Sequence, residues 1–242
     1  MALTRRDLVL LVAALAGAAL TAGLGVWQLD RAAQKNAIEA AMQSRRIMPP
    51  LAAAQLARSE AEAAPQEHRS AVVSGRWDGV HTVYLENRPM NGRTGFFVVT
   101  PLLLDDGSAV LVERGWLPRD PTDRTKLTPP PTPAEPVKLA GRIALHLSQV
   151  YQIGDAGSGP IRQNLDLAPF AAETGLKLRP LVVVQEDGQL APLDGLQRDW
   201  PKPAADVQKH YGYAFQWFAM AALIIGLYVW FQLIRPRRRA QR

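Results

Sequence analysis

Four histidines and the absence of cysteine limit the chemistry open to this 242-residue chain. Without cysteine there are no disulfides, thiolate nucleophiles, iron–sulfur clusters or thiolate-bound metals. His68, His81, His146 and His210 are isolated, without the HxH or HxxxH spacing that would bring two imidazoles to one ion. A haem, in contrast, needs only one or two axial ligands and an apolar slot, so a single histidine beside an apolar segment could hold one.

His210 is the histidine with such surroundings, because it begins the stretch HYGYAFQWFAMAALIIGLYVWFQLI, which includes Tyr213 and Trp217. Counted around a helix, His210, Ala214, Trp217 and Ala221 share one side. An imidazole at this place can anchor the helix, handle a proton or bind a metal. Since Tyr, Trp and His are also common at the membrane–water interface, the residues alone leave these alternatives open.

Enzyme motifs are absent from the chain. It has no Walker loop, no GxGxxG after an expected strand and no HExxH. Its carboxylates are interspersed with arginines, as on a solvated surface. We therefore expect a protein that is not an enzyme. A membrane-tethered enzyme would need two carboxylates that meet in space, which one sequence does not reveal.

Two windows contain no Asp, Glu, Lys or Arg: Leu8–Leu29, with 22 residues, and His210–Ile234, with 25. About 20 apolar residues suffice to cross a bilayer as a helix. The first window follows Arg5 and Arg6, as in a signal peptide, but it exceeds a typical signal-peptide core and ends without a clean cleavage site. We expect two retained transmembrane helices.

The net charge of +6 comes from the two ends of the chain. The residues before the first window carry +1 and those after the second carry +5, whereas 21 basic and 21 acidic residues balance between positions 30 and 212. This distribution argues against a nucleic-acid partner, and the positive-inside rule places both termini in the cytoplasm. The expected order, in a bacterial inner membrane, is a cytoplasmic N-terminus (1–7), a span (8–29), a periplasmic domain (30–209), a span (210–234) and a basic cytoplasmic tail (235–242).

Small residues recur every four positions in the first window. Such rows let helix backbones approach closely in lipid, so we expect this helix to contact the second one or the helices of a partner. The two rows are Ala14, Ala18 and Ala22, and Gly17, Thr21 and Gly25.

The residues between the windows predict a mainly β domain. The first helix is expected to continue over Asp30–Arg46, which lacks Gly and Pro, and a short helix is expected within Met48–Pro65. A period of two then predicts strands. Further on, Arg119–Pro136 reads as a long exposed loop and Asp166–Gly175 as a short helix. The expected strands lie in His68–Trp77, His81–Arg88, Gly95–Leu104, Ser108–Trp116, Val137–Leu145 and Arg179–Asp187.

The predicted fold class is therefore α+β: two transmembrane helices flank a mainly antiparallel β domain that resembles a barrel or a sandwich. Within this domain, Gly92 and Gly95 are expected to serve a turn that needs positive φ. Trp77 and Trp116 are expected to fill the core rather than contact a ligand.

Three separated stretches resemble the surfeit-locus cytochrome oxidase assembly factor family. They are LGVWQLDRAAQK (Leu24–Lys35), ENRPMNGRTGFFVVTPLLLDDGSAVLVERGWLP (Glu86–Pro118) and HYGYAFQW (His210–Trp217). The elements G-x-W-Q-x-x-R, N-R-P-x-x-G-x-x-G, R-G-W-x-P and H-x-x-Y-x-x-x-W match in order and in register between the two windows. The resemblance covers nearly the whole chain.

This resemblance implies a non-enzymatic factor that assists the maturation of haem–copper terminal oxidases by holding or delivering haem a. It implies His210 as the iron ligand, with Trp217 and Tyr213 beside it, and we expect the small faces of the two spans to leave room for the macrocycle. The implied partners are the oxidase catalytic subunit, the haem a synthesis machinery and the lipid bilayer. The alternative is a scaffold that stabilises the catalytic subunit without binding haem.

Three arginines keep open roles. Arg88 and Arg114 could reach haem propionates or acidic residues of a partner, or could form structural ion pairs with Glu86 or Glu113. Arg31, with Lys35 one turn further along the helix, is placed to meet lipid headgroups.

Overall fold

The computed structural model describes residues 4–123, 126–151, 157, 159–188, 190, 193–200 and 207–235. Its chain divides into two compact units. Met1–Ala41 together with Lys202–Arg242 forms the first, here called the helical unit, and Met42–Pro201 forms the second, the barrel unit. Most of the expected basic tail lies outside the described residues.

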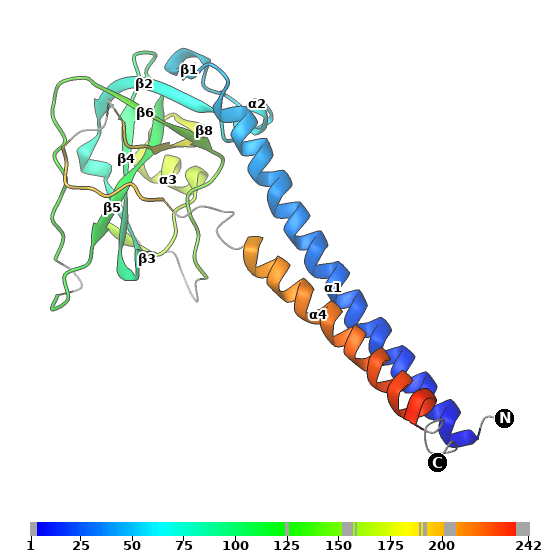
Figure 1. The fold of residues 1–242 in the computed structure, drawn as a ribbon. Coiled ribbons are helices and arrows are strands. Elements are labelled where there is room, and N and C mark those ends of the chain that lie inside the picture. Colours follow the sequence, from blue (N-terminus) through cyan, green and yellow to red (C-terminus); the bar gives the residue numbers. More distant parts are fainter. Residues whose placement is uncertain are drawn as a thin grey trace. The chain divides into compact units, whose positions relative to one another are not determined.

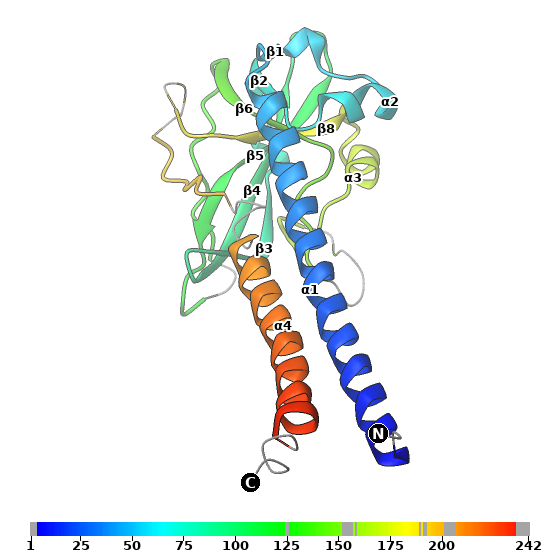
Figure 2. The same cartoon turned by 45° about the vertical axis from the view of Figure 1, so that its right-hand side comes forward.

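The helical unit contains two long helices that lie side by side in both views (Figures 1 and 2). Helix α1 runs from Arg5 to Arg46, and α4 runs from Val207 to Tyr228 and continues as π-helical turns over Val229–Ile234. Both are long and apolar enough to cross a membrane. The expected continuation of the first helix to Arg46 is confirmed, and the helix ends shortly before Pro49, which cannot continue it.

The barrel unit is built on a sheet whose strands close into a ring. In the order β2, β6, β8, β5, β4, each strand pairs with the next, and β4 returns to β2 through Arg76↔Leu103 and Trp77↔Leu102. The pairings in this ring are antiparallel except β5–β8. The mainly antiparallel domain is confirmed, and of the two expected forms it is the barrel. The ring strands are β2 (Ser70–Trp77), β4 (Arg93–Leu103), β5 (Ala109–Pro118), β6 (Val137–Ala144) and β8 (Leu178–Gln185).

Shorter elements surround this ring. Strand β3 (Val83–Met90) pairs with β4 and carries β7 (Ile161–Arg162) on its other edge, while β1 (Leu51–Ala52) pairs with β2. Helix α3 (Leu167–Thr174) is the expected short helix. The helix expected within Met48–Pro65 is reduced to α2 (Glu60–Ala63), with a 3₁₀ turn before it at Ala53–Gln55 and another directly after it at Ala64–Gln66.

The two glycines of the NRPMNGRTG stretch serve different purposes. Asn91 and Gly92 form the β3–β4 turn with φ of 50° and 75°, so the expected positive φ is confirmed at Gly92. For Gly95 the expectation is wrong. It lies within β4, and a Cβ there would come within 2.3 Å of the Leu117 carbonyl oxygen and 2.4 Å of the Trp116 ring. The position therefore needs glycine because an indole packs onto its backbone.

The tryptophans of the barrel fill its core, as expected. Trp116 is fully buried, and its indole Nε1 donates a 2.8 Å hydrogen bond to the carbonyl of Arg88. Trp77 is partly buried and packs against the other main core cluster, which includes Val73, Leu102 and Leu181. Core packing thus accounts for both aromatic residues without a ligand.

Arg88 and Arg114 are both 1% exposed, which removes them from contact with a cofactor or partner. The Arg88 guanidinium donates hydrogen bonds to the backbone carbonyls of Glu86, Ser148 and Gln163. It does not bond to the carboxylates expected from the sequence. Arg114 lies 3.5 Å from Asp194. The two arginines are structural, but their expected ion-pair partners were wrong.

The long loop between β5 and β6 is tied to the barrel through the same arginine. In its described part, Arg119–Asp123 and Lys126–Pro136, it has no helix or strand and is mostly exposed, as expected. The Arg114 guanidinium donates a 2.8 Å hydrogen bond to the Pro131 carbonyl and lies 4.4 Å from the centre of the Trp77 ring. The hydrogen bond from Arg114 therefore holds the loop at Pro131, and the same guanidinium makes a cation–π contact with Trp77.

Glu113 is a buried carboxyl group that lacks a full set of hydrogen-bond partners. It is 4% exposed, and within the described residues its Oε1 has no donor. Burial raises the pKa of Glu113 to about 7, an effect opposed by the positive charges of Arg142 and Arg88. The folded protein therefore binds this proton more tightly than the unfolded chain, whose ordinary glutamate pKa is near 4.5.

We predict that this proton makes folding pH-dependent. The stabilisation from Glu113 is fully present below pH 4.5 and is lost as the pH rises through 7, because the ionised carboxylate is poorly tolerated in the core. Relative to Glu113→Gln, the wild-type protein should lose stability on the order of 3 kcal/mol between pH 5 and pH 8. Thermal unfolding of both proteins across this range measures the effect, with Glu135→Gln in the exposed loop as control. Parallel pH profiles for the wild type and Glu113→Gln would contradict the prediction.

Candidate functional site at the helix pair

Small residues bring α1 and α4 together. A Cβ added to Gly17 would lie 3.5 Å from Ile224, and one added to Gly25 would lie 2.8 Å from the Phe218 ring. Thr21, between these glycines, is buried and turns its hydroxyl back to the Gly17 carbonyl at 2.8 Å. The Gly17–Thr21–Gly25 row therefore contacts α4, which confirms the expected use of small residues in helix packing.

The small faces of both helices are in contact with side chains. Phe218 and Ile224 of α4 pack against the glycine positions of α1. On α4, the small residues Ala214 and Ala221 are themselves buried. Room for a macrocycle beside these faces stays a prediction.

One polar pair connects the two helices beside this apolar contact. The Nδ1 atom of His210 lies 2.7 Å from the Oε1 atom of Gln28, and both side chains are partly buried. Because the amide oxygen of Gln28 faces the ring and can only accept, this contact is a hydrogen bond in the tautomer that has its proton on Nδ1. The other ring nitrogen, Nε2, then holds the lone pair. This is the tautomer that a histidine needs in order to bind a metal through Nε2.

A second bond joins the helices nearby. The side-chain amide of Asn36 donates a 3.1 Å hydrogen bond to the hydroxyl of Tyr211, the residue that follows His210. Two hydrogen bonds from α1 thus reach consecutive residues at the start of α4, which limits the ways in which this end of the helix can rotate.

The other residues expected near a haem are placed less closely. Trp217 lies two helical turns from His210 on the same side and is partly buried. Tyr213 is 51% exposed and lies beside the face of α4 that contains the buried residues Ala214 and Ala221. Arg31 is exposed on α1, donates a 3.1 Å hydrogen bond to Gln34 and lies 5.9 Å from the centre of the Trp27 ring. The structure therefore joins His210 to Gln28, and not to the residues expected beside it.

Gln28 was not among the residues singled out from the sequence. It lies 182 positions from His210, so spacing along the chain does not relate the two. A signal was nevertheless present: Gln28 is the only amide residue in the first charge-free window, and it belongs to the G-x-W-Q-x-x-R element. A polar side chain at that depth needs a partner, because an unpaired amide is costly in an apolar environment.

The remaining histidines lie in the barrel unit. His81 Nδ1 lies 2.6 Å from Asp78, while His68 and His146 lie elsewhere in that unit. Across the described ranges, no group of three or more His, Cys, Asp or Glu residues is arranged to hold a metal ion. A metal site built entirely from such side chains is therefore not found in that part of the chain.

Comparison with known proteins now adds to this geometry. Residues 15–222 match the SURF1 family, a range that includes both Gln28 and His210. The chain belongs to the SURF1 family. The resemblance seen in the three sequence stretches is thereby confirmed.

Three relatives illustrate the relationship. The SURF1-like protein of Rickettsia bellii is 25% identical over 210 residues, which cover 85% of this chain and 83% of that protein. The cytochrome oxidase assembly protein SHY1 of Saccharomyces cerevisiae is 30% identical over 95 residues, 39% of this chain and 24% of that one. Surfeit locus protein 1 of Arabidopsis thaliana is 34% identical over 111 residues, 42% of this chain and 31% of that one.

We predict that Gly25→Leu separates the helix pair, because its side chain would overlap the Phe218 ring. Gly23→Leu is the matched control, since a Cβ at Gly23 meets nothing within 4 Å. The chain has no cysteine, so a Gly17→Cys/Ile224→Cys pair can report helix contact through the yield of a short bifunctional thiol cross-link. Gly25→Leu should reduce this yield severalfold and Gly23→Leu should leave it unchanged. Equal yields in both backgrounds would show that Gly25 does not set the approach.

Proposed function

We propose that this chain is a membrane-anchored assembly factor for haem–copper oxidase and that it holds haem a through His210 before insertion into the catalytic subunit. Membership of the SURF1 family supports the assembly role, since the yeast member is named a cytochrome oxidase assembly protein. The observation that carries the haem-binding role is the 2.7 Å contact between His210 Nδ1 and Gln28 Oε1. It prepares Nε2 of His210 for iron.

We further propose that both termini lie in the cytoplasm and the barrel unit in the periplasm of a bacterial inner membrane. Two helices long and apolar enough to cross a bilayer support this arrangement. The arginines at the start of α1, Arg5 and Arg6, and those from Arg235 onward support the orientation, because basic residues are retained on the cytoplasmic side.

The residues of the helical unit suit a cargo that has to leave again. His210 would offer the iron one imidazole nitrogen, and one such bond is easier to break than two. The Gln28 amide oxygen accepts a hydrogen bond from the Nδ1–H group, which fixes the orientation of the ring. The half-exposed Tyr213 offers aromatic surface that an apolar macrocycle could contact, and the partly buried Trp217 lies on the same side of α4 as His210.

A scaffold without haem is the second candidate, and one observation favours it. The His210–Gln28 and Asn36–Tyr211 contacts both join α1 to α4. His210 therefore has a structural task even when it binds nothing. In this case the protein would stabilise the oxidase catalytic subunit during assembly through protein contacts alone.

The visible spectrum of the detergent-purified protein, made in cells able to synthesise haem a, distinguishes the two candidates. We predict a haem band for the wild type, its loss in His210→Ala, and an unchanged band in His146→Ala, which alters a histidine of the barrel unit. An equal band in His210→Ala would remove His210 as the ligand. No band in a natively folded wild type would reject haem holding and leave the scaffold.

We predict that Gln28 positions the imidazole. In haem-free protein labelled with ¹⁵N-histidine, NMR should show the Nδ1–H tautomer of His210 in the wild type and a mixture of tautomers in Gln28→Ala. Haem affinity of Gln28→Ala should fall 10- to 100-fold, the usual effect of removing the partner of a metal-binding histidine. Gln28→Glu keeps an acceptor and should restore both properties.

The control is Gln34→Ala, which removes an exposed amide from the same helix. An unchanged His210 tautomer in Gln28→Ala would refute the positioning role, whether or not the wild type binds haem.

A further inference from the structure

The barrel unit contains a groove of about 630 Å³ that the proposed function does not use. It opens where two strands of the ring stop pairing. The β6–β8 ladder ends at Ala144↔Val182, and Pro180, two residues before Val182, has no N–H to continue it. The β5–β8 pairing is also irregular here, because the five residues of β8 from Leu178 to Val182 face the three residues of β5 from Ala109 to Leu111.

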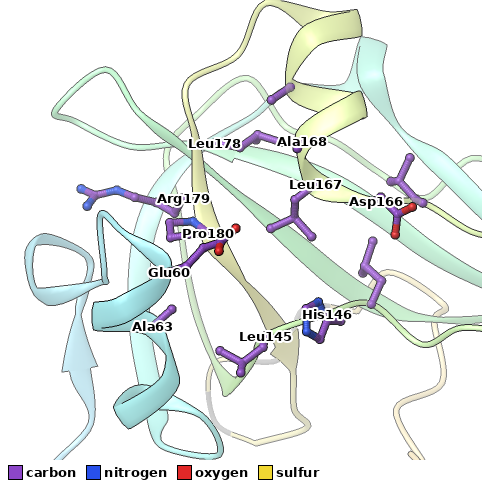
Figure 3. A pocket seen from close by; sticks show the side chains of 13 residues that line it. Glu60, Ala63, Leu145, His146, Asp166, Leu167, Ala168, Leu178, Arg179 and Pro180 are labelled. Carbon is purple, nitrogen blue, oxygen red and sulfur yellow. The ribbon is translucent and has the colours of Figure 1, made fainter.

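The groove is bounded by α2, α3, the start of β8 and the segment that follows β6 (Figure 3). Most of the described residues that line it are aliphatic, and none of them is Phe, Tyr or Trp. Such a surface accommodates flexible aliphatic side chains, and its volume lies within the usual range of ligand sites. The apolar lining residues are Ala63, Leu145, Leu147, Leu165, Leu167, Ala168, Ala171, Leu178 and Pro180.

Two polar groups in the groove have no partner in the described part of the chain. Figure 3 shows the Glu60 carboxylate directed from α2 toward Leu167, with the His146 imidazole below it. Neither side chain takes part in a hydrogen bond or ion pair there. Asp166, at the other side, accepts a 3.1 Å hydrogen bond from Gln149, which leaves its negative charge uncompensated.

The cation that lines the groove does not balance these carboxylates. Arg179 turns its guanidinium away from the groove in Figure 3. That guanidinium lies 2.6 Å from Asp106 and donates to the Leu56 carbonyl at 2.9 Å. The groove therefore combines an aliphatic lining with excess negative charge.

We propose that this groove binds a short extended segment of a partner protein that carries aliphatic side chains and a lysine or arginine. The aliphatic side chains cover the apolar walls, and the cation meets Glu60 and Asp166. The same two carboxylates would repel phosphate headgroups and haem propionates, so neither a phospholipid nor a second haem suits the groove. This site is separate from the helical unit, and its existence does not depend on haem binding at His210.

Fluorescence polarisation with the full-length protein in detergent tests the proposal. The probes are a labelled peptide of sequence Leu-Leu-Lys-Leu-Leu and the same peptide with Glu in place of Lys. The wild type should bind the Lys peptide saturably and at least tenfold more tightly than the Glu peptide. Glu60→Lys should abolish this preference, and Glu135→Lys, an equal charge change in the exposed loop between β5 and β6, should preserve it.

A second variant separates the groove from non-specific binding. Ala168→Trp places an indole in the groove from an exposed position on α3, so that the fold is retained and the groove is filled. Binding of the Lys peptide should fall at least tenfold, with an unchanged circular dichroism spectrum. Equal binding of both peptides, undiminished binding to Ala168→Trp, or no saturable binding at millimolar peptide would each overturn the proposal.

Discussion

A polar pair between two apolar helices depends on close backbone approach, and this requirement organises the helical unit. Gln28 and His210 have short side chains relative to the 8–10 Å that separates typical helix axes. They meet at 2.7 Å because Gly25, one turn before Gln28, lets Phe218 pack against the backbone of α1. Neither the small-residue row nor the hydrogen bond is sufficient by itself, since the row aligns the helices and the bond selects their rotation.

The distance along the chain between the two members of this pair has a consequence for assembly of the protein. Gln28 lies in the helix that precedes the barrel unit and His210 in the helix that follows it. The contact between these two side chains therefore forms only after both helices and the barrel unit between them have been made.

Sequence patterns predicted the elements better than their contacts. Charge-free windows and alternating strands depend on local composition, so α1, α4 and the six main strands were found. Local patterns did not predict the roles of Gln28, Gly95 and Glu113, because these roles arise from partners that are distant in sequence. The partners are an imidazole on the other helix, an indole on the neighbouring strand and the enclosed barrel core. Ring closure through β2 and β4 rests on only two paired positions and leaves no signal in either strand.

The motifs of the barrel and those of the helices consequently have different physical meanings. In the barrel, Trp116 covers Gly95 and bonds to the carbonyl of Arg88, so N-R-P-x-x-G-x-x-G and R-G-W-x-P describe one packed corner of the core. In the helical unit, the elements containing Gln28 and His210 describe a hydrogen bond that leaves one nitrogen free. Damage to the first pair of motifs should act through folding of the barrel, whereas damage to the second should alter the contact between α1 and α4 and the state of the His210 ring. A loss of function alone does not separate the two, but the state of the His210 ring does.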